Sequence, residues 1–215
     1  MKETKVSFRS GQLLLEGALA TPSGKGPFPT VLVCHPHPSF GGSMENNVVV
    51  SICEALFKKS IMSLRFNFRG VGKSEGRFGH GIGEQEDVKA AISFLSLEKQ
   101  TDLRRLGLVG YSAGAVFGLP VAVADPRVSA LAAISLPLGM MELDAVRTCP
   151  KPKLFVLGSK DDFTSVNELN EFCQSCVEPK ECAVIDGADH IWEGYEARLA
   201  KTVSDFLSRV LNPIK

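Results

Sequence analysis

Two kinds of hydrophobic pattern alternate along this chain and predict its secondary structure. Partial alternation of apolar and polar residues over 5–8 and 12–20, interrupted by Arg9-Ser10-Gly11, predicts an opening antiparallel pair of strands. Short continuous apolar runs, typical of strands buried on both faces, occupy residues 30–34, 61–66, 106–109, 128–135, 153–158 and 183–185. Apolar residues at helical spacing predict helices over about 44–59, 84–97, 113–124, 166–176 and 193–211.

This alternation of strands and helices predicts an α/β protein with a mostly parallel, doubly wound sheet and helices on both faces. We expect residues 1–215 to form a single domain, because a 23.2 kDa chain without repeats can bury one substantial core. Ligands of such sheets bind beyond the carboxyl ends of the strands. The histidines all fall in loops that leave strands at that edge, and they are His35, His37, His80 and His190.

One of these strand ends carries a candidate nucleophile. Gly110-Tyr111-Ser112-Ala113-Gly114 follows an apolar run and precedes a helical pattern, so the chain turns sharply at Ser112. Glycines at 110 and 114 remove side chains that would collide in such a turn. The helix that opens after Ser112 offers free amides to an oxyanion, so the chemistry indicated is nucleophilic attack by the serine.

The partners that a serine nucleophile needs follow in the expected order. Asp161 and Asp162 come after the strand at 153–158, and His190 comes after the strand at 183–185. The order serine, aspartate, histidine accompanies this type of turn. His190 would accept the proton of Ser112, and an aspartate would orient the imidazole. Asp161, three residues beyond Gly158, is the predicted partner of His190, and Asp162 is expected to cap the next segment.

These segments together resemble a known family. The elbow around Ser112, the Gly-x-x-Asp loop at 158–161, Gly187-Ala188-Asp189-His190, and the loops at 35–44 and 67–74 are similar to a small α/β-hydrolase of the dienelactone-hydrolase-like branch. The resemblance covers about residues 13–211. It implies an α/β-hydrolase fold without a cap domain, and hydrolysis of acyl esters. True dienelactone hydrolases have a cysteine nucleophile, whereas this elbow carries Ser112.

The same fold implies an oxyanion hole built from two backbone amides. One belongs to the residue after the nucleophile, here Ala113, and the other to the loop after the third strand. Pro36 and Pro38 lack an N–H, so His37 is the expected second donor. His35 and His37 are alternatively metal ligands, but two histidines without clustered carboxylates or thiols are weak evidence, and we predict no metal and no cofactor.

The remaining polar loop residues have more modest expected roles. The interval between residues 135 and 153 is too short for a cap, so we expect an open cleft that takes small acyl groups. Its expected lining residues are Phe40, Tyr111, Leu138, Phe163 and Trp192. His80 is expected to be a solvated loop residue, with contact to substrate as the alternative, and Arg69 and Ser74 to hold their loop together.

Composition limits the partners and the setting. Lysine plus arginine and aspartate plus glutamate number 24 each, so no global field attracts nucleic acid or an anionic membrane, and a small-molecule ester is the expected partner. The charged N-terminus and the absence of long apolar runs predict a soluble, cytoplasmic protein, as a monomer or homodimer. Six cysteines are too sparse for a disulfide scaffold; Cys173, Cys176 and Cys182 suggest zinc or redox chemistry only weakly.

Three functions remain open from the sequence. The first is a serine hydrolase that cleaves a carboxylic ester or thioester through an acyl-enzyme. The second is a non-catalytic binding or scaffold protein on the same fold, since a fold alone does not establish activity. The third is a peptidase or acyltransferase that uses the same three residues.

Overall fold

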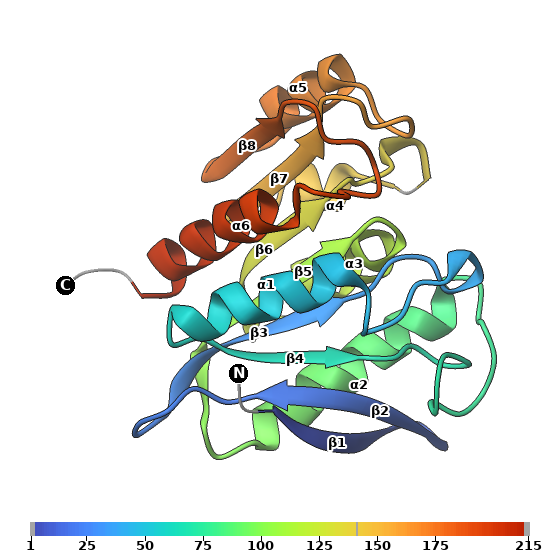
Figure 1. Ribbon diagram of the computed structural model, residues 1–215, viewed down its shortest axis with the longest axis vertical. Helices are drawn as coiled ribbons and strands as arrows, with labels where there is room; N and C mark the ends of the chain where they lie inside the picture. The colour runs from blue at the N-terminus through green and yellow to red at the C-terminus, as the bar shows by residue number, and fades with distance from the viewer. Residues whose placement is uncertain (1–2, 141, 213–215) are drawn as a thin grey trace.

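The chain forms one twisted sheet with helices on both faces (Figure 1). The computed structural model describes residues 3–140 and 142–212. In that part the sheet has eight strands in the order β1-β2-β4-β3-β5-β6-β7-β8. The strands are β1 (Glu3–Ser10), β2 (Leu13–Ala20), β3 (Phe28–Cys34), β4 (Met62–Phe66), β5 (Thr101–Tyr111), β6 (Val128–Ile134), β7 (Lys153–Gly158) and β8 (Lys180–Ile185).

Strand direction follows the predicted pattern. β1 and β2 form the antiparallel hairpin, β2 also pairs antiparallel with β4, and all remaining neighbours are parallel. The expectation of a mostly parallel sheet is therefore confirmed. The carboxyl ends of β3 to β8 consequently meet at one edge, which gathers the loops that follow them.

Helices cover the two faces of the sheet in separate groups. The main helices are α1 (Asn47–Lys58), α2 (Ile82–Leu97), α3 (Ala113–Ala124), α5 (Val166–Ser175) and α6 (Glu196–Leu211). α1 and α6 pack on one face and α2, α3 and α5 on the other (Figure 1). Within β3, Leu32 and Cys34 join the core under α2 and α3, whereas Val31 and Val33 join the core under α1 and α6. Both faces of the central strands are therefore buried, which explains their continuous apolar sequence.

Element boundaries differ from the sequence predictions in several places. α6 begins at Glu196 rather than near 193, because Trp192 and Gly194 have left-handed φ values of 67° and 79° that interrupt a helix. β8 begins at Lys180, three residues before the apolar run. The interval between β6 and β7 contains a 3-10 turn, Leu138–Met140, and a short helix α4 (Asp144–Arg147).

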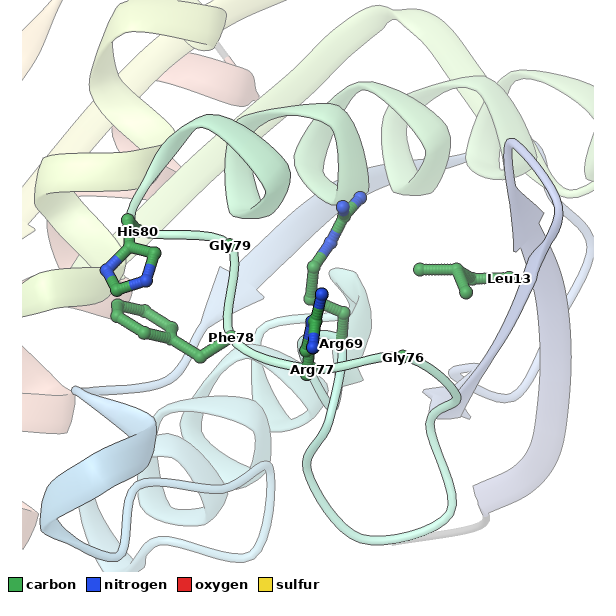
Figure 2. Close-up of a pocket in the computed structure, with 7 residues that line it drawn as sticks. All are labelled: Leu13, Arg69, Gly76, Arg77, Phe78, Gly79 and His80. Carbon is green, nitrogen blue, oxygen red and sulfur yellow. The ribbon is translucent and has the colours of Figure 1, made fainter.

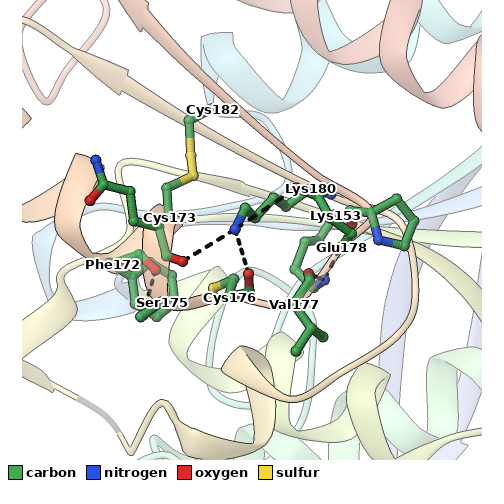
Figure 3. The surroundings of a disulfide bond; sticks show 11 residues. Lys153, Phe172, Cys173, Ser175, Cys176, Val177, Glu178, Lys180 and Cys182 are labelled. Carbon is green, nitrogen blue, oxygen red and sulfur yellow. Dashed lines mark hydrogen bonds and ion pairs between the residues drawn. A yellow bond between two sulfur atoms is a disulfide. The ribbon is translucent and has the colours of Figure 1, made fainter.

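The cysteines also depart from expectation. Cys173 on α5 and Cys182 on β8 form a disulfide, with a Cα–Cα distance of 6.6 Å (Figure 3). The remaining four, Cys34, Cys53, Cys149 and Cys176, are free and buried. The sequence places Cys182 with Cys173 and Cys176 as weak evidence for zinc or redox chemistry, but it does not predict this disulfide, because the packing of α5 beside β8 is a tertiary feature. Among the described residues, no helix is long and apolar enough to cross a bilayer.

Candidate active site

Ser112 occupies a sharp turn between β5 and α3. Its φ of 53° and ψ of −119° are rarely adopted by a residue with a side chain. Gly110 and Gly114 make the turn possible: a Cβ at Gly110 would lie 2.4 Å from the Cα of Ala115, and one at Gly114 would lie 2.4 Å from the carbonyl oxygen of Cys34. The turn places the Ser112 hydroxyl at the carboxyl edge of the sheet, within reach of His190.

The structure brings Ser112, His190 and Asp161 together. Nε2 of His190 lies 3.0 Å from Oγ of Ser112, and Nδ1 lies 2.9 Å from Oδ2 and 3.1 Å from Oδ1 of Asp161. An ionised carboxylate only accepts hydrogen bonds, so Nδ1 carries the imidazole proton and Nε2 is free to accept the proton of Ser112. This is the arrangement in which a histidine can act as a general base toward a serine.

Asp161 stays ionised although its side chain is fully buried. Burial raises the pKa of this carboxyl, but hydrogen bonds from His190, from the Ser135 hydroxyl and from the Phe163 N–H lower it, and the net pKa lies below the usual value. The Phe163 N–H donates to Oδ1 at 2.9 Å. A buried negative charge is therefore kept beside the imidazole, where it stabilises the cation that forms on proton transfer.

Asp162 does not have the role expected from the sequence. It is exposed, as predicted for a side chain pointing away from His190. The expectation that it caps the next helix is wrong, because Ser165 is the N-cap of α5 and forms a capping box with Glu168. Three residues of turn separate Asp162 from the helix start, so its carboxylate cannot reach the free amides there.

Comparison with known proteins places this geometry in a family. A model described as X-Pro dipeptidyl-peptidase (S15 family) matches residues 11–170. The chain belongs to this family of α/β-hydrolases. The match includes the positions of Ser112 and Asp161 and ends before His190.

Solved structures and a curated relative agree with this assignment to the α/β-hydrolases. A structure described as an alpha-beta serine hydrolase homologue from Coxiella burnetii is 31% identical, with a TM-score of 0.85 over 95% of this chain and 97% of that chain. A serine hydrolase "without lid" from Xanthomonas campestris is 27% identical, with a TM-score of 0.86 over 100% and 98%. An uncharacterized protein of Rickettsia prowazekii is 29% identical over 83% of this chain and 78% of its own length. The predicted α/β-hydrolase fold without a cap is thereby confirmed.

The two predicted amide donors of this α/β-hydrolase lie on adjoining segments. Within residues 3–140 and 142–212, neither the Ala113 N–H nor the His37 N–H has a hydrogen-bond acceptor. Gly114 packs directly against the end of β3, since a Cβ there would be 2.5 Å from the carbonyl oxygen of His35. This contact brings the loop of His37 beside the first turn of α3.

His35 is a structural residue. It is fully buried; its Nδ1 donates to the carbonyl of Pro36 at 2.7 Å, and its Nε2 accepts from the Phe68 N–H at 3.1 Å. Burial lowers its pKa to about 4. Both ring nitrogens are therefore engaged in a neutral imidazole, which ties the loop after β3 to the loop after β4.

The residues expected to line an open cleft divide into two groups. Phe40 and Phe163 are exposed and Leu138 is half-buried, and the Phe163 ring lies 4.3 Å from the His190 ring. Tyr111 and Trp192 are buried, so the expectation that they line the cleft is wrong. Their polar atoms point inward: the Tyr111 hydroxyl donates to the His190 carbonyl, and the Trp192 indole donates to Ser135.

A cavity of about 640 Å³ adjoins the His37 loop on the side of β2 (Figure 2). His80 and Phe78 stand together at one end of it, and Arg69 and Arg77 lie in its middle (Figure 2). The Phe78 ring lies 4.9 Å from the His37 ring.

Arg69 does hold its loop, as predicted, through paired hydrogen bonds to Asp87. Ser74 does so too, with its hydroxyl donating to the Asn67 carbonyl.

Sequence reasoning missed Ser135. It follows β6 at the same sheet edge, and its hydroxyl accepts the indole N–H of Trp192 at 3.0 Å. The available signal was a single hydroxyl residue directly after a buried strand, which was included in the strand itself.

Proposed function

We propose that this α/β-hydrolase cleaves small carboxylic esters or thioesters through an acyl-enzyme on Ser112. The observation that carries the proposal is the continuous set of hydrogen bonds from Ser112 through His190 to the buried carboxylate of Asp161. We assign Ser112 as nucleophile, His190 as general base and acid, and Asp161 as the group that orients His190.

The first half-reaction forms the acyl-enzyme. Oγ of Ser112 attacks the carbonyl carbon of the ester while its proton passes to Nε2 of His190. The carbonyl oxygen becomes an oxyanion, which the N–H groups of Ala113 and His37 stabilise. The bond to the leaving oxygen or sulfur then breaks, and His190 returns the proton to the leaving group.

The second half-reaction releases the acid. A water molecule gives a proton to Nε2 of His190 and attacks the acyl carbon, and the bond to Ser112 breaks as the proton returns to its Oγ. Both half-reactions use the same oxyanion donors. The exposed rings of Phe163, beside His190, and Phe40, beside His37, would contact the apolar parts of a small ester.

The S15 match favours a second candidate, removal of dipeptides from X-Pro N-termini, by the same steps on an amide. The two differ in the leaving group and are separated by comparing a p-nitrophenyl ester with an X-Pro p-nitroanilide. The exposed Phe163 ring, 4.3 Å from the His190 ring, favours a small apolar ester.

Fluorophosphonate labelling tests the nucleophile directly. We expect one equivalent of label on Ser112 and hydrolysis of p-nitrophenyl butyrate, both absent in Ser112→Ala. Ser39→Ala, which changes an exposed serine at the same sheet edge, is the matched control and should retain both. A wild-type protein that neither labels nor hydrolyses the ester would support a binding or scaffold role.

A further inference from the structure

The cavity shown in Figure 2 has apolar side chains at both ends and cations between them. Leu13 of β2 stands at one end, and the rings of Phe78 and His80, with centroids 5.2 Å apart, stand at the other. The side chains of Arg69 and Arg77 lie in the middle (Figure 2). Among the described residues that line the cavity, none is an aspartate or a glutamate. Apolar walls with a few charged groups are typical of ligand sites, and the charge here attracts an anion.

Arg77 carries the uncompensated charge of this cavity. Arg69 is paired with the fully buried carboxylate of Asp87 at 2.7 Å. Arg77 is exposed, and across the part of the chain that the structure describes its guanidinium forms no hydrogen bond and no ion pair. The nearby carboxylate of Glu75 instead accepts the N–H of Leu14 at 2.7 Å. The guanidinium of Arg77 therefore has its charge and its N–H donors available to a ligand.

The loop that carries Arg77 is held in a fixed shape. The N–H groups of Gly79 and Gly81 donate to the fully buried carboxylate of Glu84 at 2.8 and 2.7 Å. His80 lies between these glycines with a left-handed φ of 54°. Because the loop is already ordered by a buried carboxylate, a ligand in the cavity does not have to order it, and this favours binding.

The order of the strands places the cavity on the acyl side of the proposed reaction. His190 follows β8 and must give a proton to the leaving group, so the leaving group lies toward β8. β5, which leads to Ser112, has β6, β7 and β8 on one side and β3 and β4 on the other (Figure 1). The loop 67–81, which lines much of the cavity, follows β4. The acyl chain of a substrate on Ser112 therefore points toward this loop.

Aromatic rings connect the neighbourhood of Ser112 with the cavity. Phe117 lies on α3, the helix that follows Ser112, and its ring is 6.5 Å from the His37 ring. The His37 ring is in turn 4.9 Å from the ring of Phe78 at the end of the cavity. His37 and Phe78 are half-buried, so part of their surface is open to a ligand. An acyl chain that extends from Ser112 over these two rings would reach Arg77.

We propose that Arg77 binds an oxyanion, a carboxylate or a phosphate, at the far end of the acyl chain of the substrate. The inference rests on the proposed function of Ser112, and it names the substrate class as esters whose acyl chain ends in an anionic group. Phe78 and Leu13 contact the methylene groups, and the guanidinium can donate two parallel hydrogen bonds to the oxyanion. The same charge repels the N-terminal ammonium that an X-Pro substrate would bring to the acyl side, which favours the ester.

The first test compares kcat/KM for mono-p-nitrophenyl suberate with kcat/KM for its neutral methyl ester. In the wild type we expect the half ester to be preferred, mainly through a lower KM. Arg77→Gln should lower this preference about fivefold, a moderate change because the guanidinium is exposed, and Arg77→Lys should keep part of it. A wild type without preference for the half ester would overturn the proposal.

Arg104→Gln is the control for the change in net charge. Arg104 is also exposed, but it lies near the amino end of β5, at the opposite end of the strand from Ser112. We expect this variant to keep the wild-type preference. An equal loss of preference in Arg77→Gln and Arg104→Gln would show a general charge effect and contradict a site at Arg77.

A third substrate identifies the anion. It has a phosphonate in place of the free carboxylate of mono-p-nitrophenyl suberate, on a chain of equal length. A higher kcat/KM for the phosphonate would assign an acyl chain that ends in phosphate, and a higher value for the carboxylate would assign a half ester of a dicarboxylic acid. If both anions are poorer substrates than the methyl ester, the proposal is wrong.

The second test needs no catalytic activity. Ser112→Ala is titrated with monomethyl suberate, a half ester that this variant cannot cleave, and the amide resonances of residues 76–80 are followed by NMR. We expect these resonances to shift, to shift less with dimethyl suberate, and not to shift when Arg77→Gln is added. Unchanged resonances with the half ester would refute the site. If the wild type shows neither labelling nor esterase activity, the proposed function fails, while this titration still decides whether Arg77 binds the anion.

Discussion

The backbone N–H of Ser112 donates a 2.8 Å hydrogen bond to the carbonyl oxygen of Ile134. This bond continues the pairing of β5 with β6, which ends at Tyr111 and Ile134. The strained residue is therefore anchored to the neighbouring strand through its main chain, while its side chain stays free for His190.

Ser112→Ala should remove ester hydrolysis by at least about 10⁴-fold without loss of the fold. The main-chain bond to Ile134 and the packing of Gly110 and Gly114 do not involve the hydroxyl. Steady-state hydrolysis and urea unfolding of the same preparation measure both effects. Wild-type turnover in this variant would show that another residue is the nucleophile.

Asp161→Asn should lower turnover by about 10⁴-fold, which is the loss that the same aspartate-to-asparagine change causes in a serine-protease triad. The amide of asparagine has one acceptor oxygen where the carboxylate has two. It also carries no negative charge to stabilise the imidazolium. Asp162→Asn is the matched control. Because Asp162 is exposed and Ser165 caps α5, we expect little change in turnover or stability. A larger turnover loss in folded Asp162→Asn would reverse the assignment.

Phe163→Ala should raise KM for p-nitrophenyl butyrate several-fold with less effect on kcat, because the exposed ring stands against His190 and would contact bound ester. Leu97→Ala removes another exposed apolar side chain, at the end of α2, and should change neither constant. Small esters should also be better substrates than emulsified long-chain triglycerides. Interfacial activation on triglyceride would contradict an open site.

The lowered pKa of His35 predicts that the folded protein loses stability in mild acid. Its folded pKa of about 4 is below the unfolded value of about 6.5, so the unfolded state binds more protons between these values and stability falls as pH falls. We expect the free energy of unfolding to drop by about 2 kcal/mol from pH 7 to pH 5. His35→Gln should be less stable at pH 7 but lose most of this slope, as measured by urea unfolding. Equal slopes would assign the effect to other groups.

Reduction of the Cys173–Cys182 disulfide should lower the free energy of unfolding by about 2–3 kcal/mol, given a sequence separation of nine residues. Urea unfolding with and without dithiothreitol measures the change. Cys182→Ser should resemble the reduced protein and not respond to the reductant. Alkylation of six thiols in the unreduced, denatured protein would show that the bond does not form.

Most elements of this fold could be predicted from the sequence because their signals are local. Buried parallel strands require continuous apolar runs, and helices on one face require apolar residues at helical spacing. The turn at Ser112 is marked by the glycines that its close contacts with Ala115 and Cys34 require. Strand ends meet at one edge in any parallel sheet, so the sequence could also predict that Ser112, Asp161 and His190 lie near one another.

The tertiary structure alone decided where side chains point and which remote segments touch. The sequence predicts Trp192 to line the cleft, but the residue is buried and its indole donates to Ser135, 57 positions away. Cys182 reaches Cys173 only because β8 packs beside α5. Local periodicity specifies which residues are buried. The partner of a buried polar group depends on side-chain direction across segments distant in sequence, and no local pattern encodes it.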